Sequence, residues 1–335
     1  MSREFSLLPF NVNEFPNAPS SDPSLFLAGD VRANEQVAQT AMHTLFMREH
    51  NYWADQFAAM KLDDGETIYQ FARAIVSVEI QAISYREFLP ALLGHGDIPP
   101  YRGYRPDLDA SISNIFATAA YRFGHTVLSP QLLRLNSDGS THAAGNLALA
   151  SAFFNPNELI SIGLEPYLRG LSKQVAQDVD ANVIDDVRNF LFGPPGSGGF
   201  DLVSLNVQRG RDHGLPSYNE IRNGVRQSRA GEFADITSDP ELRTRLSEAY
   251  SNVDDIDVWL GLLCEDHVVG ALVGPTLHSI LVDQFQRLRD GDRFWYQSYL
   301  PRRIARFIET QTLAKIIRRN TEIGRETPDN VLLVQ

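Results

Sequence analysis

The sequence has a single cysteine, Cys264, among its 335 residues. An intrachain disulfide is therefore impossible, and the count also excludes a zinc site built on several cysteines. We expect Cys264 to be a small buried residue. Long apolar runs are missing as well, because the best candidate, residues 268–282, contains Pro275 and His278. A membrane-spanning helix needs about 20 apolar residues, so we expect a soluble chain with no transmembrane segment.

Positive charge is also scarce, with 30 Lys and Arg against 42 Asp and Glu, a net charge of -12. This balance argues against a nucleic acid or an anionic membrane as the main partner. With 43% hydrophobic residues, the chain can bury the core of one large domain or of two ordinary ones. We find no internal repeat and hardly any strand alternation, so the predicted fold class is mainly α.

The first 28 residues are rich in Pro, Asn and Ser and have no periodicity, which predicts an irregular lead-in. The opening MSREFSLLPFNVNEF lacks a basic segment followed by an apolar one, so no signal peptide is expected in this chain. A single domain is predicted over residues 29–335. The Gly/Pro-rich stretch FGPPGSGGF, residues 192–200, interrupts it and is interpreted as a linker.

Apolar spacing predicts helices over most of this domain. The first runs from an N-cap at Asp30 through Met60, and Arg32 and Glu35 in its first turn are expected to form a surface ion pair. Further helices are predicted at 66–93, around 112–128, in short pieces over 150–192, and at 256–263, 277–289 and 302–318. His43 and His50 are seven residues apart, too far for one metal ion, and are interpreted as structural.

Arg122 and His125 share one face of the predicted helix around 112–128, away from its apolar stripe. An imidazole can bind a metal ion, and a guanidinium pairs with carboxylates. Haem needs both groups, one for iron and one for its propionates. A lone histidine on an amphipathic helix is more often structural, so the spacing alone leaves both interpretations open.

A polar run follows the Gly/Pro-rich stretch, with six polar side chains between Asn206 and His213. Because apolar residues adjoin it, we interpret it as a buried hydrogen-bonded network.

Three separated stretches together carry a family resemblance. They are GDVRANEQVAQTAMHTLFMREHN (29–51), YRFGHT (121–126) and LNVQRGRDHGLPSYNEIR (205–222). In this order the chain resembles the animal-type haem peroxidases, the superfamily of myeloperoxidase, peroxidasin and the cyclooxygenases. Connecting pieces such as DVWLGLL and QFQRLRDGDRFWY also match. The resemblance implies the helical peroxidase fold, with residues 29–335 forming the major, C-terminal part of the family domain.

On the proximal side of the haem, the resemblance implies that His125 is the axial iron ligand. Asn206 would accept a hydrogen bond from the other ring nitrogen, which fixes the tautomer and strengthens the ligand. Arg122 and Arg209 match the arginines that hold the haem propionates. The implied cofactor is haem b.

On the distal side, Arg32 matches the catalytic arginine and Glu35 the glutamate that can form an ester with a haem methyl. Gln36 stands where myeloperoxidase has a methionine linked to haem, so no sulfonium bond is expected. Arg122 occupies the position of the radical-forming tyrosine of the cyclooxygenases and fatty-acid dioxygenases, and Tyr121 lies one residue earlier. The peroxidase branch is therefore the better match.

The chain departs from the family pattern upstream of Arg32. The family's distal histidine, its partner glutamine and its calcium-binding loop precede that position, whereas none of the eight histidines here precedes His43. We expect this chain to be a fragment of a longer gene product without the family calcium site. A second polypeptide that supplies the distal half, or a loss of peroxide chemistry, are the alternatives. Family members are often secreted, but the sequence itself predicts no location.

The function implied by the resemblance is a haem-dependent peroxidase connected with oxidative stress. It would reduce hydrogen peroxide and oxidise a small electron donor, either a halide or an organic molecule. The alternative is a non-catalytic haem-binding or adhesion-like module that has lost the distal half of its site. We expect the chain by itself to be a slow peroxidase, because no distal base has been found in it.

Overall fold

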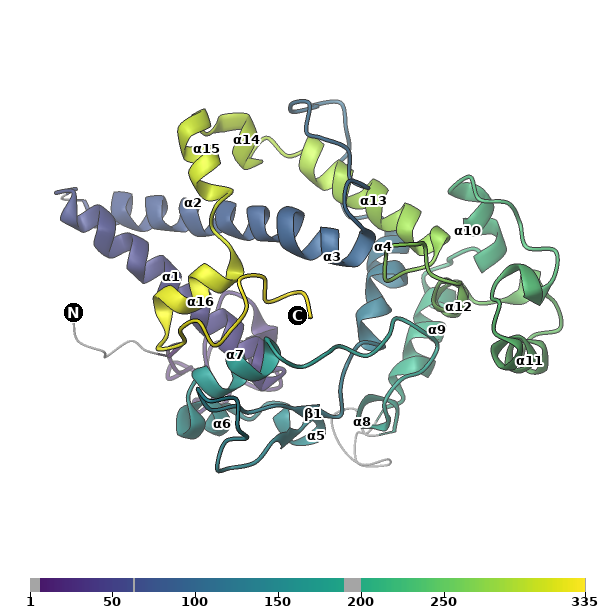
Figure 1. Cartoon of the computed structure of the whole chain (residues 1–335), viewed down its shortest axis with the longest axis horizontal. Coiled ribbons are helices and arrows are strands. Elements are labelled where there is room, and N and C mark those ends of the chain that lie inside the picture. The colour runs from purple at the N-terminus through teal and green to yellow at the C-terminus, as the bar shows by residue number, and fades with distance from the viewer. Residues whose placement is uncertain (1–6, 63, 190–199, 335) are drawn as a thin grey trace. The chain divides into compact units, whose positions relative to one another are not determined.

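The computed structural model describes residues 7–62, 64–189 and 200–334. The chain divides into two compact units. Unit 1 comprises Met1–Glu87, Pro130–Val175 and Arg302–Gln335, and unit 2 comprises Phe88–Ser129 and Ala176–Pro301. Helices form almost all of the regular structure in the described residues, where the one sheet has two strands (Figure 1). The predicted mainly α class is confirmed.

Unit 1 is built on a helical hairpin, in which α1 (Val37–Ala59) and α2 (Gly65–Ile83) pack side by side in opposite directions (Figure 1). The remaining elements of unit 1 are η2 (Val31–Asn34), β1 (Gln131–Leu132), β2 (Leu147–Ala148), α5 (Leu149–Ala152), α6 (Pro156–Ile162), α7 (Glu165–Leu171), α15 (Arg302–Ile308) and α16 (Leu313–Asn320). The strands β1 and β2 pair antiparallel. From α2 the chain passes through a π-helical turn, Ser84–Phe88, into α3 (Leu89–Leu93). The predicted helix over 66–93 is therefore present, with one irregular turn inside it.

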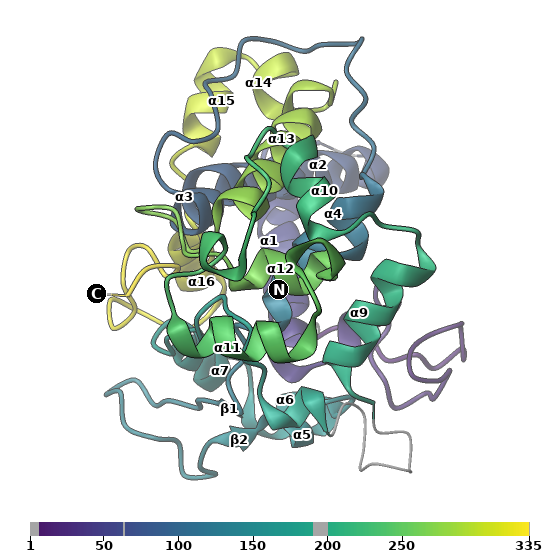
Figure 2. The same ribbon diagram turned by 90° about the vertical axis from the view of Figure 1, so that its right-hand side faces the viewer.

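Unit 2 is organised around α12 (Val258–Cys264), which packs against α9, α10, α13 and η4. Figure 2 shows α12 beside α9 (Leu202–Asp212). The other elements of unit 2 are α3, α4 (Asn114–Thr118), η4 (Ala120–His125), α8 (Asp185–Arg188), α10 (Tyr218–Gly224), η5 (Phe233–Asp235), α11 (Pro240–Ala249), η6 (Val253–Asp255), α13 (Pro275–Asp290) and α14 (Tyr296–Tyr299). Gly261 permits the close approach of α12 to α10, because a Cβ at this position would lie 2.3 Å from Cγ of Tyr218.

The predicted start of the first long helix is wrong. Asp30 caps only the 3₁₀ turn η2, where its carboxylate accepts from the backbone N–H of Arg32 at 2.8 Å. Gln36 is then extended (φ -150°, ψ 139°) and pairs with Phe153 as an isolated β-bridge. Because this extended residue interrupts the helical backbone, α1 begins at Val37 with the Gln36 side chain as its cap. Arg32 is therefore not on the same helix as His43.

Two further helix predictions need correction. Around residues 112–128 the chain forms α4 and then the 3₁₀ helix η4, with a break at Ala119 (φ -129°, ψ -62°). The predicted helix over 302–318 is two helices, because Thr312 is extended (φ -98°, ψ 159°) and caps α16 through the backbone N–H of Lys315.

The lead-in is irregular over its described part, residues 7–28, with one antiparallel bridge between Phe10 and Phe26. Residues 1–6 of the lead-in and 192–199 of the predicted linker lie outside the described residues. No helix in the described ranges combines the length and the apolar character needed to cross a bilayer. Cys264 is buried, as predicted.

A buried acid pair fastens α1, α2 and α16 together in unit 1. Glu49 and Glu79 have no exposed surface. One nitrogen of Arg319 lies 2.9 Å from Oε1 of Glu49 and 3.6 Å from Oε1 of Glu79. The Trp53 indole N–H also donates to Glu79, at 3.2 Å. Because one guanidinium serves two carboxylates, burial and the neighbouring Glu49 raise the pKa of Glu79 to about 8.

This pKa predicts a pH-dependent stability. The folded state holds a proton on Glu79 that the unfolded chain releases near its ordinary value of 4.5. The resulting stabilisation is complete below about pH 4.5 and is lost as the pH rises towards about 8, at no more than about 1.4 kcal/mol per pH unit. In Glu79→Gln this slope should disappear, as measured by urea unfolding at pH 5 to 9. The exposed Glu248→Gln is the control and should keep this slope. An unchanged slope in Glu79→Gln would contradict the raised pKa of Glu79.

Candidate functional site

The structure brings His125 and Asn206 together in unit 2, although 81 residues separate them in sequence. His125 is the last residue of η4, and Asn206 lies on the buried face of α9 with 1% of its surface exposed. The Nδ2 atom of Asn206 is 2.8 Å from Nδ1 of His125. Asp201 caps α9 by accepting from the backbone N–H of Val203 at 2.9 Å, which fixes where the helix starts.

Arg122 lies on the same face of η4 as His125, because a 3₁₀ helix has three residues per turn. The predicted common face is therefore correct, although the helix type is not. Arg209 follows Asn206 by three residues on α9, so it neighbours that side chain. His125, Asn206, Arg122 and Arg209 thus form one cluster in unit 2.

The imidazole of His125 is neutral at physiological pH. Burial is the largest cause that lowers its pKa, to about 4, and the positive charges of Arg122 and Arg209 act in the same direction. The contact with Asn206 opposes the shift. A neutral imidazole keeps a lone pair on one ring nitrogen, which is what a metal ligand requires. The cluster therefore favours a ligand histidine over a charged one.

The amide of Asn206 determines which nitrogen of His125 is available. With Nδ2 against the ring, Nδ1 accepts, so that the ring proton is on Nε2. In that orientation Oδ1 of Asn206 is buried and has no hydrogen-bond partner among the described residues. Turning the amide by 180° exchanges two groups of nearly equal shape. Oδ1 then accepts from Nδ1–H, and the lone pair of Nε2 is free to bind a metal ion.

The two arginines of the cluster have no carboxylate partner in the described part of the chain. Nε of Arg122 donates to the backbone carbonyl of Ala117 at 3.0 Å. Nε of Arg209 is buried and makes no hydrogen bond to any described residue. Burial and the charge of Arg209 both lower the pKa of Arg122. Two unpaired cations beside a neutral imidazole suit a ligand that carries a metal ion and two carboxylates, which is the composition of haem.

The predicted distal residues, Arg32 and Glu35, lie in unit 1. Arg32 does not pair with Glu35 as predicted, because it forms a bidentate pair with Asp30, with Nε–Oδ1 at 3.0 Å and Nη2–Oδ2 at 2.7 Å. The Arg32 side chain is 69% exposed. Glu35 is half-buried, and burial raises the pKa of its carboxyl. Its backbone carbonyl accepts from the N–H of Phe154 at 3.3 Å.

The predicted buried network over residues 206–213 is largely wrong. In α9 only Asn206 and Gly210 are buried, four residues apart on one face. Gln208 and Asp212 are exposed and bond to each other at 2.7 Å. A single helix buries one stripe, so most of this polar run faces away from the core.

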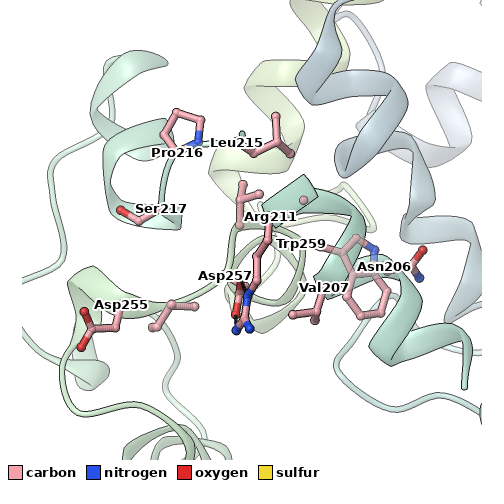
Figure 3. A pocket seen from close by; sticks show the side chains of 12 residues that line it. Asn206, Val207, Arg211, Leu215, Pro216, Ser217, Asp255, Asp257 and Trp259 are labelled. Atoms are coloured by element: carbon pink, nitrogen blue, oxygen red, sulfur yellow. Dashed lines mark hydrogen bonds and ion pairs between the residues drawn. The ribbon is translucent and has the colours of Figure 1, made fainter. Parts of the chain in front are cut away.

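A cavity of about 170 Å³ adjoins the cluster in unit 2. Figure 3 shows Asn206, Val207 and Trp259 towards one end and Ser217 and Asp255 towards the other. Between them, Arg211 forms an ion pair with Asp257 at 2.7 Å. The remaining lining residues are Gly210, Leu215, Pro216, Ile256 and Val258.

Trp259 belongs to this site but was not among the predicted residues. Its indole N–H donates to the backbone carbonyl of Arg122 at 3.3 Å, across 137 residues of sequence. The only sequence signal was its place in DVWLGLL, a short apolar stretch that predicts a core residue and no polar contact.

Comparisons with known proteins identify the family of this chain. A family model described as "Animal haem peroxidase" matches residues 1–332. Peroxinectin A of Dictyostelium discoideum is 42% identical over 307 residues, which are 91% of this chain and 57% of the relative. Thyroid peroxidase of Sus scrofa is 41% identical over 294 residues, or 84% of this chain and 32% of that protein. This chain therefore spans little more than half of the first of these relatives.

Solved structures of known proteins share the fold of this chain. Peroxidase A from Dictyostelium discoideum has a TM-score of 0.91 and 40% identity, and the match covers 97% of this chain and 64% of that one. A fatty acid alpha-dioxygenase from Arabidopsis thaliana has a TM-score of 0.81 at 20% identity, with 100% of this chain and 59% of that chain covered. The second likeness concerns the fold alone.

The unpaired arginines generate a prediction for the haem-free chain. Arg209→Met keeps the length of the side chain and removes a partly buried charge that repels Arg122. We expect the free energy of unfolding to rise by roughly 1 kcal/mol, because an unsatisfied buried donor is lost. Arg211→Met on the same helix is the matched control and should lower the stability by up to about 1 kcal/mol, since it breaks an ion pair whose arginine is exposed, while Tyr250 still donates to the Asp257 carboxylate. Denaturant unfolding of both variants would measure the two changes, and a less stable Arg209→Met protein would show that Arg209 does not destabilise the haem-free chain.

Proposed function

Since this chain belongs to the animal haem peroxidase family, we propose that it binds haem b through Nε2 of His125 and contributes the proximal half of a peroxidase site. The observation that carries the proposal is the cluster in unit 2, where a neutral imidazole against a buried amide stands beside two arginines without carboxylate partners. Hydrogen peroxide and a small electron donor, a halide or an organic molecule, are the proposed substrates. Bound haem supplies the iron at which peroxide is reduced and to which the donor returns electrons.

The residues of the cluster divide this work between them. Asn206 accepts from Nδ1–H of His125, which keeps the ring in the tautomer that binds iron and makes it a stronger donor. Arg122 and Arg209 bind the two propionates, and each guanidinium gains a charge-assisted hydrogen bond that it lacks in the haem-free chain. Glu35 is the candidate for an ester link to haem. Joining its carboxyl to a haem methyl would remove two electrons and two protons, and hydrogen peroxide, the proposed substrate, would be the oxidant and leave as water.

Arg32 is proposed as the cation that stabilises negative charge as the peroxide O–O bond breaks. To act in this way its guanidinium must leave Asp30. An exposed ion pair of this kind is worth about 0–1 kcal/mol, so its release costs little compared with the gain at a desolvated reaction centre.

The same Arg32–Asp30 pair is the observation that favours the second candidate function, a non-catalytic haem-binding or adhesion-like module. In such a module Arg32 would remain a surface residue, and haem would bind through the proximal cluster alone. Loss of Arg32 should slow the reaction with peroxide only in the peroxidase. Loss of His125 should abolish haem ligation in both candidates.

The first test of the proposal concerns haem binding. Purified His125→Ala supplied with haem should lose the Soret band of ligated haem, because the axial nitrogen is gone. Asn206→Ala should retain binding but weaken it by roughly 10- to 100-fold, the usual cost of removing the partner of a ligand histidine. The exposed His95→Ala is the control for a histidine of the same unit and should titrate with haem like the wild type. A native Soret band in His125→Ala would refute the ligand assignment.

The second test separates the two candidate functions. In the haem-reconstituted protein, Arg32→Gln should slow the reaction with hydrogen peroxide by roughly two to three orders of magnitude while haem content stays unchanged. Asp30→Asn is the matched control, because asparagine also caps a helix but holds Arg32 less strongly; its rate should equal or exceed that of the wild type. Stopped-flow mixing with peroxide measures both. Equal rates in Arg32→Gln and wild type would remove Arg32 from the mechanism and support the non-catalytic module.

A further inference from the structure

The turn that carries His125 has little internal support. η4 is a six-residue 3₁₀ helix, and no side chain caps its N-terminus. Ala119, which precedes it, adopts neither helical nor extended backbone angles (φ -129°, ψ -62°). Hydrogen bonds within a 3₁₀ helix have poorer geometry than those of an α-helix. The position of His125 therefore depends on contacts from other elements.

Trp259 supplies such a contact from α12. Its side chain is almost fully buried, with 2% of the residue exposed. The indole N–H donates to the carbonyl of Arg122 at 3.3 Å, in the middle of η4. Since α12 also packs against α9, it is in contact with both of the elements that carry His125 and Asn206. Trp259 lines the same cavity as Asn206 and Val207 of α9 (Figure 3).

We propose that Trp259 is a positioning residue for His125, and that its indole N–H holds the backbone of η4 where the imidazole meets the amide of Asn206. The proposal rests on the proposed function in one respect, since a correctly placed ring is what would bind iron. The contact itself, between Trp259, Arg122 and the His125–Asn206 pair, belongs to the chain without haem.

The site of this hydrogen bond explains why it matters. The backbone of Arg122 lies one 3₁₀ turn before that of His125, so one anchor sets the starting point of both side chains. The 2.8 Å contact of His125 with Asn206 weakens steeply when its angle or length changes. A small shift of η4 would therefore reduce it, and would move the guanidinium of Arg122 at the same time.

The competing explanation is that Trp259 only fills space in the core. The two explanations predict different results when the N–H is removed but the shape is kept. Replacement of Trp259 alone by its benzothiophene analogue, in which sulfur stands in place of the indole N–H, does this and leaves Trp53 and Trp295 untouched. Leu262→Ala is the matched control, because Leu262 is equally buried on the same helix and makes no polar side-chain contact.

The primary readout is the ¹⁵N NMR signals of the His125 ring in the haem-free chain. In the benzothiophene protein we expect the signal of the nitrogen bonded to Asn206 to move towards that of a free imidazole. Exchange of the ring N–H with solvent should become up to about tenfold faster, since one hydrogen bond is weakened. Leu262→Ala should lower the melting temperature and leave the ring signals unchanged. Unchanged ring signals in the benzothiophene protein, or equal changes in Leu262→Ala, would overturn the positioning role.

A second readout follows the same variants after haem is added. The iron–histidine stretching frequency in resonance Raman spectra reports the donor strength of the ring without any turnover. It should fall in the benzothiophene protein and stay at the wild-type value in Leu262→Ala. If wild type shows no such band, the ligand assignment of the proposed function fails, whereas the measurement on the haem-free chain still decides the role of Trp259.

Discussion

The contact between His125 and Asn206 is the interaction on which the rest of the site depends. It joins a 3₁₀ turn to a helix that begins 77 positions after that turn ends, so neither element can form it alone. An imidazole can present its lone pair in either of two tautomers, and the partner of Nδ1 selects between them. Only the tautomer with Nδ1–H leaves the lone pair of Nε2 free for the proposed bond to iron. The packing of α12 against both elements is therefore part of the chemistry of the site as well as of the core.

The identities of the cluster residues were predictable from sequence, and their local geometry was not. YRFGHT and LNVQRGRDH supply His125, Arg122, Asn206 and Arg209 through resemblance. Apolar spacing over 112–128 predicted an α-helix, but a 3.6-residue and a 3.0-residue period differ little over six residues. Contacts between distant residues carry no local signal at all. The Trp259 bond spans 137 residues, and the bridge between Gln36 and Phe153, which delays the start of the long helix to Val37, also joins residues remote in sequence.

The polar run over 206–213 shows a different limit of prediction from sequence. Composition indicated a dense set of polar groups, and their position beside apolar residues predicted burial. The helical period assigns the buried and the exposed positions of this run correctly. Asn206 and Gly210 are four residues apart and are buried, whereas Gln208 and Asp212 share an exposed side. The buried asparagine could have been identified from periodicity. The ion pair of Arg211 with Asp257 could not, since it joins two different elements.

Local charge, rather than net charge, determines what the site can bind. The chain carries a net charge of -12, yet the cluster holds two guanidinium groups, a neutral imidazole and no carboxylate from the described residues to balance them. The repulsion between Arg122 and Arg209 opposes folding of the haem-free chain, and a ligand with two carboxylates would relieve it. Binding energy is then coupled to folding energy, because a ligand held only by the native state stabilises that state by an amount that grows with the logarithm of its concentration relative to its dissociation constant. The charges of the two arginines would lower the stability of the chain without the ligand, and the same charges would raise the stability of the chain with the ligand bound.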